Sequence, residues 1–304
     1  MSYLSVYGHI ILDTLIESPK TPQNEEFTGI KDYHVRYGGT GANIATAAAR
    51  LGVPVGLNAF VGEDFPEDYR DFLTESAVDI SGVESVKGKS SRVWIINTPE
   101  GQRGFVFQGV MGEMERYERV YPAADTEWVH ISTGRPEYNL DIAKWSRKKD
   151  MNLSFDPGQE IHYVYDPESL RSMLSFSHIF FCNESELQRA LSMLELKHAG
   201  ELLDMVPMVI NTLGERGSRI IREGSEEEIP PIPADVVDPT GAGDTYRAGF
   251  YSALYRGLGY YDAALFASAA ASIVIEGYGA QEPAPRMDEV IKRLNKAGYG
   301  GTVP

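Results

Sequence analysis

The sequence is poor in the residues that mark secreted, zinc-binding and nucleic-acid-binding proteins. Its single cysteine, Cys182, allows no internal disulfide, and such a count is typical of a reducing compartment. Lys and Arg number 28 against 44 Asp and Glu, so the formal net charge is −16. This acidity argues against nucleic acid and anionic membranes as the main partners, although a local nest of N–H groups or a metal ion can still hold a small anion.

Long hydrophobic runs and hydrolase motifs are missing as well. The first residues, MSYLSVYGHIILDTLIESP, have no basic segment, and His9 and Asp13 interrupt their apolar run. We therefore expect no signal peptide, no transmembrane span and a cytoplasmic protein. The sequence has no HExxH, no paired CxxC and no GxSxG, which leaves zinc and serine hydrolases without support.

Short apolar runs alternate with helical patterns through most of the chain. Six runs are predicted strands: Tyr3–Tyr7, Val55–Val61, Trp128–Ser132, Asn152–Asp156, His178–Cys182 and Met208–Thr212. Eight segments are predicted helices: Ala42–Leu51, Pro66–Thr74, Leu140–Lys149, Glu184–Leu191, Glu201–Met205, Gly243–Tyr255, Tyr261–Glu276 and Met287–Ala297. The alternation predicts an α/β fold with a doubly wound, mostly parallel sheet flanked by helices. One large domain or two smaller ones would fit the length, and the lack of a Pro/Ser-rich linker favours a single domain, 1–304.

Two stretches interrupt this rhythm. Residues Glu25–Tyr37 and Ser81–Gln108 have the period-two alternation of antiparallel strands, as in SRVWIIN. We expect them to form a small β-sheet lid, made of about 14–37 and 81–110 and inserted into the α/β body.

The sharpest motif is DPTGAGD, from Asp238 to Asp244, which lies directly before a predicted helix. Gly241, Ala242 and Gly243 allow the backbone to turn tightly and to approach a ligand. The first N–H groups of a helix are unpaired and carry partial positive charge, so this loop suits the charge on a transferring phosphoryl group. Asp244 could accept the proton of the attacking hydroxyl. The alternative is an ordinary helix start that Asp238 or Asp244 caps.

DPTGAGD resembles a signature of the pfkB/ribokinase family of small-molecule kinases. The segment GGTGANIA at 38–45, followed by RLG at 50–52, is similar to the family's other signature. Shorter matches are VGED at 61–64, NESE at 183–186 for N-x-x-E, and TLGERG at 212–217 for T-x-G-x-x-G. The resemblance runs from about Val6 to about Gly279, in the family's order.

The resemblance implies a fold with a small β lid that often forms a dimer contact. It also implies transfer of the γ-phosphoryl group of ATP to a hydroxyl with Mg²⁺, and it leaves the need for a monovalent cation open. The matching residues receive these expected roles: Asp244 as the base; Gly241, Ala242 and Gly243 as the anion hole; Asp13, Gly39 and Asn43 against sugar hydroxyls; Asn183 and Glu186 at phosphates and Mg²⁺, with Glu186 holding the metal through water; Thr212, Gly214 and Gly217 against the nucleotide.

Structural alternatives exist for several of these residues. Asp13 could simply end a strand, and Gly39 could belong to an ordinary turn. Asn183 and Glu186 have the spacing of a helix capping box, which is compatible with a metal role for Glu186.

The segments VHISTGRPEYN, SFDPGQ and DTYRAGF look like the archaeal nucleoside and cytidine kinases of this family. The first two lie just beyond predicted strands, where doubly wound sheets bind ligands. We therefore expect polar edges of a base to be read by Arg135, Glu137, Asn139 and Gln159, although Arg135 and Glu137 could equally form a surface pair. Phe105 or Phe107 could cover the base, or belong to the lid's own core or to a dimer contact.

The sequence is compatible with three functions. The first is an ATP-dependent kinase that phosphorylates the 5′-hydroxyl of nucleosides of several bases, acting as a homodimer through the lid. The second is a sugar or sugar-phosphate kinase, for which the motif regions offer few basic residues. The third is a binding protein with a degraded kinase site, against which the intact DPTGAGD argues.

Overall fold

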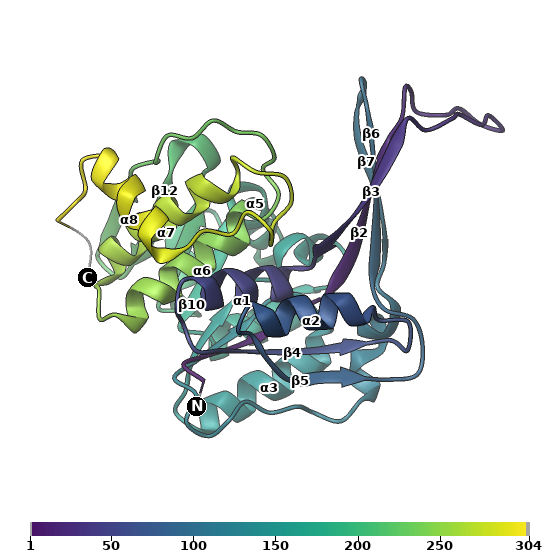
Figure 1. The fold of residues 1–304 in the computed structure, drawn as a ribbon. Coiled ribbons are helices and arrows are strands. Elements are labelled where there is room, and N and C mark those ends of the chain that lie inside the picture. The colour runs from purple at the N-terminus through teal and green to yellow at the C-terminus, as the bar shows by residue number, and fades with distance from the viewer. Residues whose placement is uncertain (1, 302–304) are drawn as a thin grey trace.

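A large, mostly parallel sheet forms the centre of the protein (Figure 1), in a computed structural model that describes residues 2–301. Its nine strands lie in the order β13-β12-β11-β10-β9-β8-β1-β4-β5. Their bounds are β1 (Leu4–Tyr7), β4 (Val55–Val61), β5 (Asp79–Ser85), β8 (Trp128–Ile131), β9 (Asn152–Phe155), β10 (Ile179–Asn183), β11 (Met208–Thr212), β12 (Ser218–Arg222) and β13 (Ser225–Ile229). The pairs β11–β12 and β12–β13 are antiparallel and the other pairs of this sheet are parallel, so the predicted doubly wound, mostly parallel sheet is confirmed.

Helices cover the sheet in two layers. The α-helices are α1 (Thr40–Arg50), α2 (Glu67–Glu75), α3 (Pro136–Lys148), α4 (Pro167–Phe176), α5 (Glu184–Leu194), α6 (Ala242–Tyr255), α7 (Tyr260–Val274) and α8 (Met287–Lys296). Four segments are 3₁₀ helices: η1 (Gly109–Arg116), η2 (Gly158–His162), η3 (Ala199–Asp204) and η4 (Gly214–Arg216). In one layer α6 packs between α1 and α7, and in the other α4 packs between α3 and α5. Within residues 2–301 no helix is both long and apolar enough to span a membrane.

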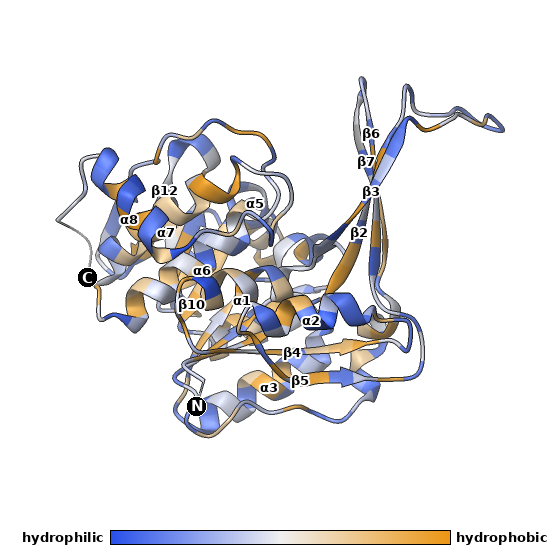
Figure 2. Ribbon diagram, viewed as in Figure 1, coloured by the Kyte–Doolittle hydropathy of each residue, from blue (hydrophilic) through white to orange (hydrophobic). Residues whose placement is uncertain are grey.

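The strands of the centre are apolar because they are enclosed on both faces. Every residue of β1 and β8 is buried, and Figure 2 shows β4 as a largely hydrophobic ribbon. This double burial explains why these strands appear in the sequence as continuous apolar runs.

Some elements differ from the sequence-based expectation. The helix expected at Glu201–Met205 is the 3₁₀ helix η3. The helix α4 and the hairpin β12–β13 were not predicted, although both carry local signals. Asp166 caps α4 and Pro167 is its first residue, while Gly224, with φ of 69°, turns the hairpin.

The lid is a four-stranded sheet in the order β3-β2-β6-β7 that projects from the body (Figure 1). It consists of β2 (Ile11–Glu17), β3 (Asp32–Gly38), β6 (Arg92–Thr98) and β7 (Gly101–Phe107). The two hairpin pairs are antiparallel as expected, but β2 and β6 pair in parallel.

The start expected for the second lid segment, at about 81, is wrong. Residues Asp79–Ser85 form β5, which pairs in parallel with β4 at the edge of the main sheet. Most residues of β5 are exposed or partly exposed and only Gly82 and Val83 are buried. A half-buried edge strand of this kind mixes apolar and polar residues, as a lid strand does, so the sequence does not tell the two sheets apart here.

The two faces of the lid carry different residues. Successive side chains of a strand point to opposite faces, so Leu12 and Asp13 lie on different sides. The strand register aligns Leu12 with Arg92 and Phe107, and Thr14 with Trp94 and Phe105. The rings of Phe105 and Phe107 therefore share the face of Leu12, where they are 62% and 42% exposed. The predictions that they cover the base or fill the lid's own core are wrong, and a dimer contact remains.

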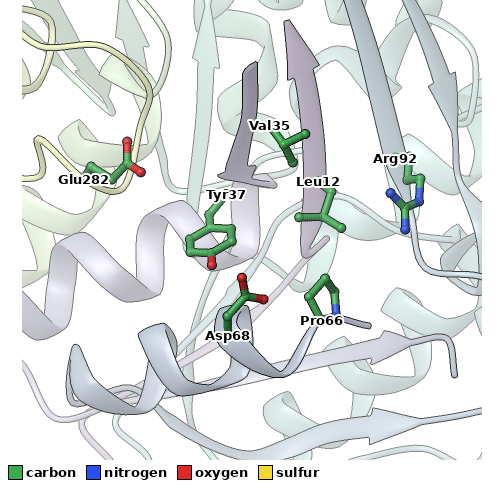
Figure 3. A pocket seen from close by; sticks show the side chains of 7 residues that line it. All are labelled: Leu12, Val35, Tyr37, Pro66, Asp68, Arg92 and Glu282. Carbon is green, nitrogen blue, oxygen red and sulfur yellow. The ribbon is translucent and has the colours of Figure 1, made fainter. Parts of the chain in front are cut away.

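A cavity of about 400 Å³ opens on the Leu12 side of the lid, above α2. Figure 3 shows its lining: Leu12, Val35, Tyr37, Pro66, Asp68, Arg92 and Glu282. Because Asp13 points to the opposite face, this cavity is separate from the predicted acceptor site.

Candidate active site

The predicted site residues gather at the carboxyl ends of the parallel strands. Asn183 and Thr212 end β10 and β11, and Asp156 directly follows β9. The order of the strands reverses between β1 and β8, since the chain places β4 and β5 on one side of β1 and the later strands on the other. In doubly wound sheets, ligands bind at such a switch point.

Asn43 of α1 and Asp244 of α6 are in contact where these two helices begin. The Nδ2 atom of Asn43 donates a hydrogen bond to Oδ2 of Asp244 over 2.7 Å. Burial raises the pKa of Asp244 to about 6, although the hydrogen bond from Asn43 and the charge of Arg247 act to lower it. A carboxyl group with this pKa is ionised at neutral pH and still basic enough to accept a proton from a hydroxyl.

Asp13, on the inner face of the lid, completes the acceptor side. Burial and, second, the carboxylate of Asp244 raise the pKa of Asp13 to about 7. A Cβ at position 38 would lie 2.0 Å from Oδ2 of Asp13, so Gly38 makes room for this carboxyl group. Gly39 precedes α1 with φ of 95°, and a Cβ there would lie 2.4 Å from a backbone oxygen of the loop after β1. The structure thus brings Asp13, Gly39, Asn43 and Asp244 together.

The loop before α6 has the form of an anion site. Gly241 precedes the helix with φ of 79°, and none of the side chains of residues 2–301 caps the helix. Asp238 instead accepts a hydrogen bond from the N–H of Thr240 within the loop, over 2.9 Å. The alternative of an ordinary start capped by Asp238 or Asp244 is therefore wrong. The N–H of Ala242 donates to the carbonyl oxygen of Pro239 over 3.3 Å. The start of the helix, which no side chain of the described residues caps, keeps the partial positive charge that an anion site needs.

The two glycines of the loop are expected to differ in their tolerance of substitution. Gly241→Ala should lower the free energy of unfolding by about 1–3 kcal/mol, because it combines a positive φ with a Cβ 2.5 Å from the Cβ of Ala280. Gly243→Ala should cost less, since Gly243 lies in the helix without a positive φ and the new Cβ meets a single side chain, Nη1 of Arg247 at 2.9 Å. Urea denaturation of both variants tests this order, and a larger loss for Gly243→Ala would contradict it.

A buried charged cluster lies behind this loop. Arg247 of α6 is 4% exposed and forms an ion pair with Asp156, Nε to Oδ2, at 2.7 Å. Its Nη1 donates to the carbonyl oxygen of Gly243 over 3.0 Å. Glu186 is also buried, and burial and the charge of Asp156 raise its pKa to about 7.

Sequence reasoning assigned no role to Arg247 or Asp156, although both stand in motifs that it quoted. The signal for Arg247 was its place in a helix whose residues from Thr245 to Ala253 are otherwise uncharged. A charge in such a segment is either exposed or paired, and here it is paired.

Asn183 and Glu186 form the capping box that the N-E-S-E spacing allowed. The N–H of Glu186 donates to Oδ1 of Asn183 over 2.9 Å, and the N–H of Asn183 donates to Oε2 of Glu186 over 2.7 Å. The cap uses one oxygen of Glu186. Within residues 2–301 no group of three or more His, Cys, Asp or Glu side chains has the geometry of a metal site. Even so, the carboxylates of Asp156 and Glu186 both interact with Arg247, and this excess of negative charge suits a divalent ion held partly by water.

The expected nucleotide residues lie beyond the end of β11. The hydroxyl of Thr212 donates to the carbonyl oxygen of Cys182 over 3.5 Å. Gly214 and Gly217 have φ of 60° and 84°. At Gly217 a Cβ would lie 2.1 Å from the backbone oxygen of Ile229, so the hairpin itself requires glycine there. Their contact with a nucleotide stays a prediction.

The four residues expected to read a base follow β8 and β9. Glu137 is exposed, whereas Asn139 is buried and its Nδ2 donates to the hydroxyl of Tyr165 over 3.0 Å. Arg135 precedes α3, and its Nε lies 3.6 Å from Oε2 of Glu115. Gln159 is exposed in η2, whereas its neighbour Glu160 is 3% exposed. Glu160 accepts hydrogen bonds from the N–H of Gly134 over 2.6 Å and from Nε2 of Gln108 over 2.8 Å. Burial raises the pKa of Glu160 to about 7. Glu160 thus joins the end of the lid to the switch point, a role that sequence reasoning missed.

Residues 1–287 match the pfkB family carbohydrate kinases, and the chain belongs to this family. The uncapped start of α6 and the neighbouring carboxylate of Asp244 are consistent with a phosphotransferase that acts on a hydroxyl group.

Several individual proteins of known activity are similar to this chain over most of its length. The chain is 35% identical over 300 residues to a nucleoside kinase of Methanocaldococcus jannaschii, covering 97% of this chain and 98% of that protein. The crystal structure of this archaeal ribokinase-family member agrees with a TM-score of 0.89 at 34% identity, covering 97% and 99% of the two chains. A cytidine kinase of Thermococcus kodakarensis is 32% identical over 260 residues, 84% of this chain and 89% of that protein. A ribokinase of Bacillus subtilis is 28% identical over 307 residues, 97% of this chain and 100% of that protein.

Proposed function

We propose that the protein is an ATP-dependent nucleoside kinase that transfers the γ-phosphoryl group to the 5′-hydroxyl. The observation that carries the proposal is the contact between Asn43 and Asp244. This contact joins the predicted acceptor side, to which Asp13 contributes, to the uncapped start of α6. The similarity to nucleoside and cytidine kinases supports a nucleoside as the acceptor.

Each of these residues then has a chemical task. Asp13 and Asn43 bind the ribose diol, since a carboxylate and an amide suit two vicinal hydroxyls. Asp244 accepts the proton of the 5′-hydroxyl as its oxygen attacks the phosphorus. The N–H groups at Gly241, Ala242 and Gly243 stabilise the charge on the phosphoryl oxygens. Asn183, Thr212, Gly214 and Gly217 lie on the ATP side, toward β10 and β11.

Mg²⁺ fits the excess of carboxylates around Arg247. Glu186 would hold it through water, with Asp156 nearby. When bound, the ion supplies positive charge that neutralises the phosphates of ATP. A requirement for a monovalent cation remains open.

Base recognition is assigned to Arg135 and Gln159 at the switch point, with Glu160 behind them. Polar contacts there give loose preference among bases when some of them pass through water. The alternative of a phosphorylated sugar acceptor is less well supported, because the motif regions offer few basic residues for an added phosphate. Arg36 pairs with Glu282 at 3.1 Å, and Arg135 is the main candidate.

A thermal-shift panel tests the proposed acceptor class. Nucleosides should raise the melting temperature at concentrations where ribose, fructose and fructose 6-phosphate do not, because a ligand that binds only the native state stabilises it. A shift with a sugar or sugar phosphate alone would favour the alternative kinase.

We further propose a homodimer formed through the lid. Its outer face exposes Tyr33, Val35, Phe105 and Phe107, at 59%, 52%, 62% and 42%. These residues share the face of Leu12 according to the register, and a patch of this kind needs cover. Light scattering at micromolar concentration should give about twice the mass of one chain. The Phe105→Lys variant should give the mass of a single chain. A monomeric wild-type protein would remove the proposal.

A further inference from the structure

The connection between α7 and α8 reaches the candidate active site from the far end of the chain. The N–H of Gly279 donates to Oδ2 of Asp238 over 2.9 Å, and Ala280 packs against Gly241. The next residue, Gln281, is 1% exposed. Three consecutive residues of this loop therefore touch the phosphoryl-binding loop or the acceptor side.

The amide of Gln281 has a defined set of partners. Its Nε2 lies 2.9 Å from Oδ1 of Asn43, 2.6 Å from the hydroxyl of Tyr69 and 3.3 Å from the carbonyl oxygen of Gly38. An amide nitrogen only donates hydrogen bonds, so Oδ1 of Asn43 must be the acceptor. The Nδ2 of Asn43 is then on the other side, where it donates to Asp244 over 2.7 Å.

We propose that Gln281 is a positioning residue that fixes the orientation of the Asn43 amide, so that this amide donates to the general base Asp244. The proposal rests on the nucleoside kinase function stated above. It adds a residue that touches neither acceptor nor phosphate and acts through Asn43. If the amide were reversed, its oxygen would face the ionised carboxylate and the hydrogen bond would become a repulsion.

The charges around Asp244 determine in which direction its pKa, and with it the pH dependence of kcat/KM, should shift. Burial raises the pKa of this carboxyl group most; the Asn43 hydrogen bond and Arg247 lower it, and Asp156 raises it. Asp13 and Glu186 are further carboxylates that interact with it. The base must be ionised, so kcat/KM should fall as the pH drops through the pKa of Asp244, near 6. Loss of the Asn43 hydrogen bond raises this pKa and moves the acid limb upward.

Two substitutions of Gln281 test whether it acts through the orientation of the Asn43 amide or only through packing. Gln281→Met keeps most of the volume and removes the donor, so the Asn43 amide is free to reverse. Gln281→Glu, once ionised, accepts from Nδ2 of Asn43 and imposes the reversed orientation. Tyr69→Phe is the matched control: it removes another buried partner of Gln281 but leaves the contact between Gln281 and Asn43.

We expect kcat/KM at pH 6 to fall by about fivefold in Gln281→Met, because a rise of one unit from a pKa near 6 lowers the ionised fraction of Asp244 at pH 6 from about one half to about one eleventh. The fall should be larger in Gln281→Glu, and the recovery toward pH 8.5 should be greater in Gln281→Met. Tyr69→Phe should lower the melting temperature and keep the wild-type acid limb. The proposal is overturned if the folded Gln281 variants keep the wild-type limb, or if Tyr69→Phe shifts it equally.

A measurement on the wild-type protein covers the case in which both Gln281 variants fail to fold. The side-chain ¹⁵N–H₂ signals of Asn43 should titrate with the midpoint of the acid limb, because its donor faces Asp244. Signals that do not respond would overturn the proposal. A wild-type protein that phosphorylates no nucleoside would instead remove the function, and that outcome is visible before any variant is made.

Discussion

Asp244→Asn is expected to lower turnover by about 10²–10⁴-fold, the usual contribution of a general base. The amide keeps the shape of the carboxyl group and loses its ability to accept the proton. The fold should remain, since Asp244 takes no part in capping α6. Single-turnover assays at saturating ATP and acceptor measure the effect, with the melting temperature as a check of folding.

Asp125→Asn is the matched control for this variant. Asp125 is exposed in the loop before β8, at the amino end of this strand, whereas the site lies at the carboxyl ends of the parallel strands. It should retain wild-type turnover. If Asp244→Asn also did so, another group would have to be the base.

Arg247→Met is expected to destabilise the protein by about 3–5 kcal/mol, because it leaves the carboxylate of Asp156 buried without its partner. Arg247 and Asp156 are 4% and 5% exposed, and their ion pair is 2.7 Å long. Adding Asp156→Asn to Arg247→Met should recover part of the loss, since the uncompensated charge is then removed. Urea denaturation of the two single variants and the double variant measures this coupling.

Arg216→Met is the control for the removal of an arginine. Arg216 pairs with Glu184 at 2.7 Å, but both side chains are largely exposed, and water replaces such a pair. No measurable change in stability is expected. If the loss in Arg247→Met were equally small, or if the double variant were no more stable than it, the pair with Asp156 would not stabilise the fold.

The sequence predicted the central sheet well because double burial leaves a simple pattern. The runs at Val55–Val61 and Met208–Thr212 coincide with β4 and β11. The lid was less predictable, since half-buried strands occur in both sheets and mix apolar and polar residues in each. That ambiguity placed Ser81–Ser85 in the lid, whereas these residues belong to β5.

The candidate site was predictable where function uses a local motif and not where it depends on packing. Asn43 and Asp244 stand in short motifs, Asp13 was expected from the family resemblance, and the structure brings the three together. The ion pair of Arg247 with Asp156 joins positions 91 residues apart in the sequence, and Gln281 meets Asn43 across 238. Such contacts leave no spacing in the sequence. The dimer, the metal and the residues at the nucleotide and the base remain predictions.

The most direct test of the central claim is a coupled assay of ADP release from ATP and Mg²⁺ with a panel of acceptors. Nucleosides should show a kcat/KM at least about 100-fold above ribose, fructose and fructose 6-phosphate. Contacts to the base are absent with these smaller acceptors, and buried polar groups left unpaired penalise them further. The product should carry the phosphate on the 5′-oxygen. A hexose or sugar phosphate that outperforms every nucleoside would contradict the account of the acceptor and leave the kinase assignment standing.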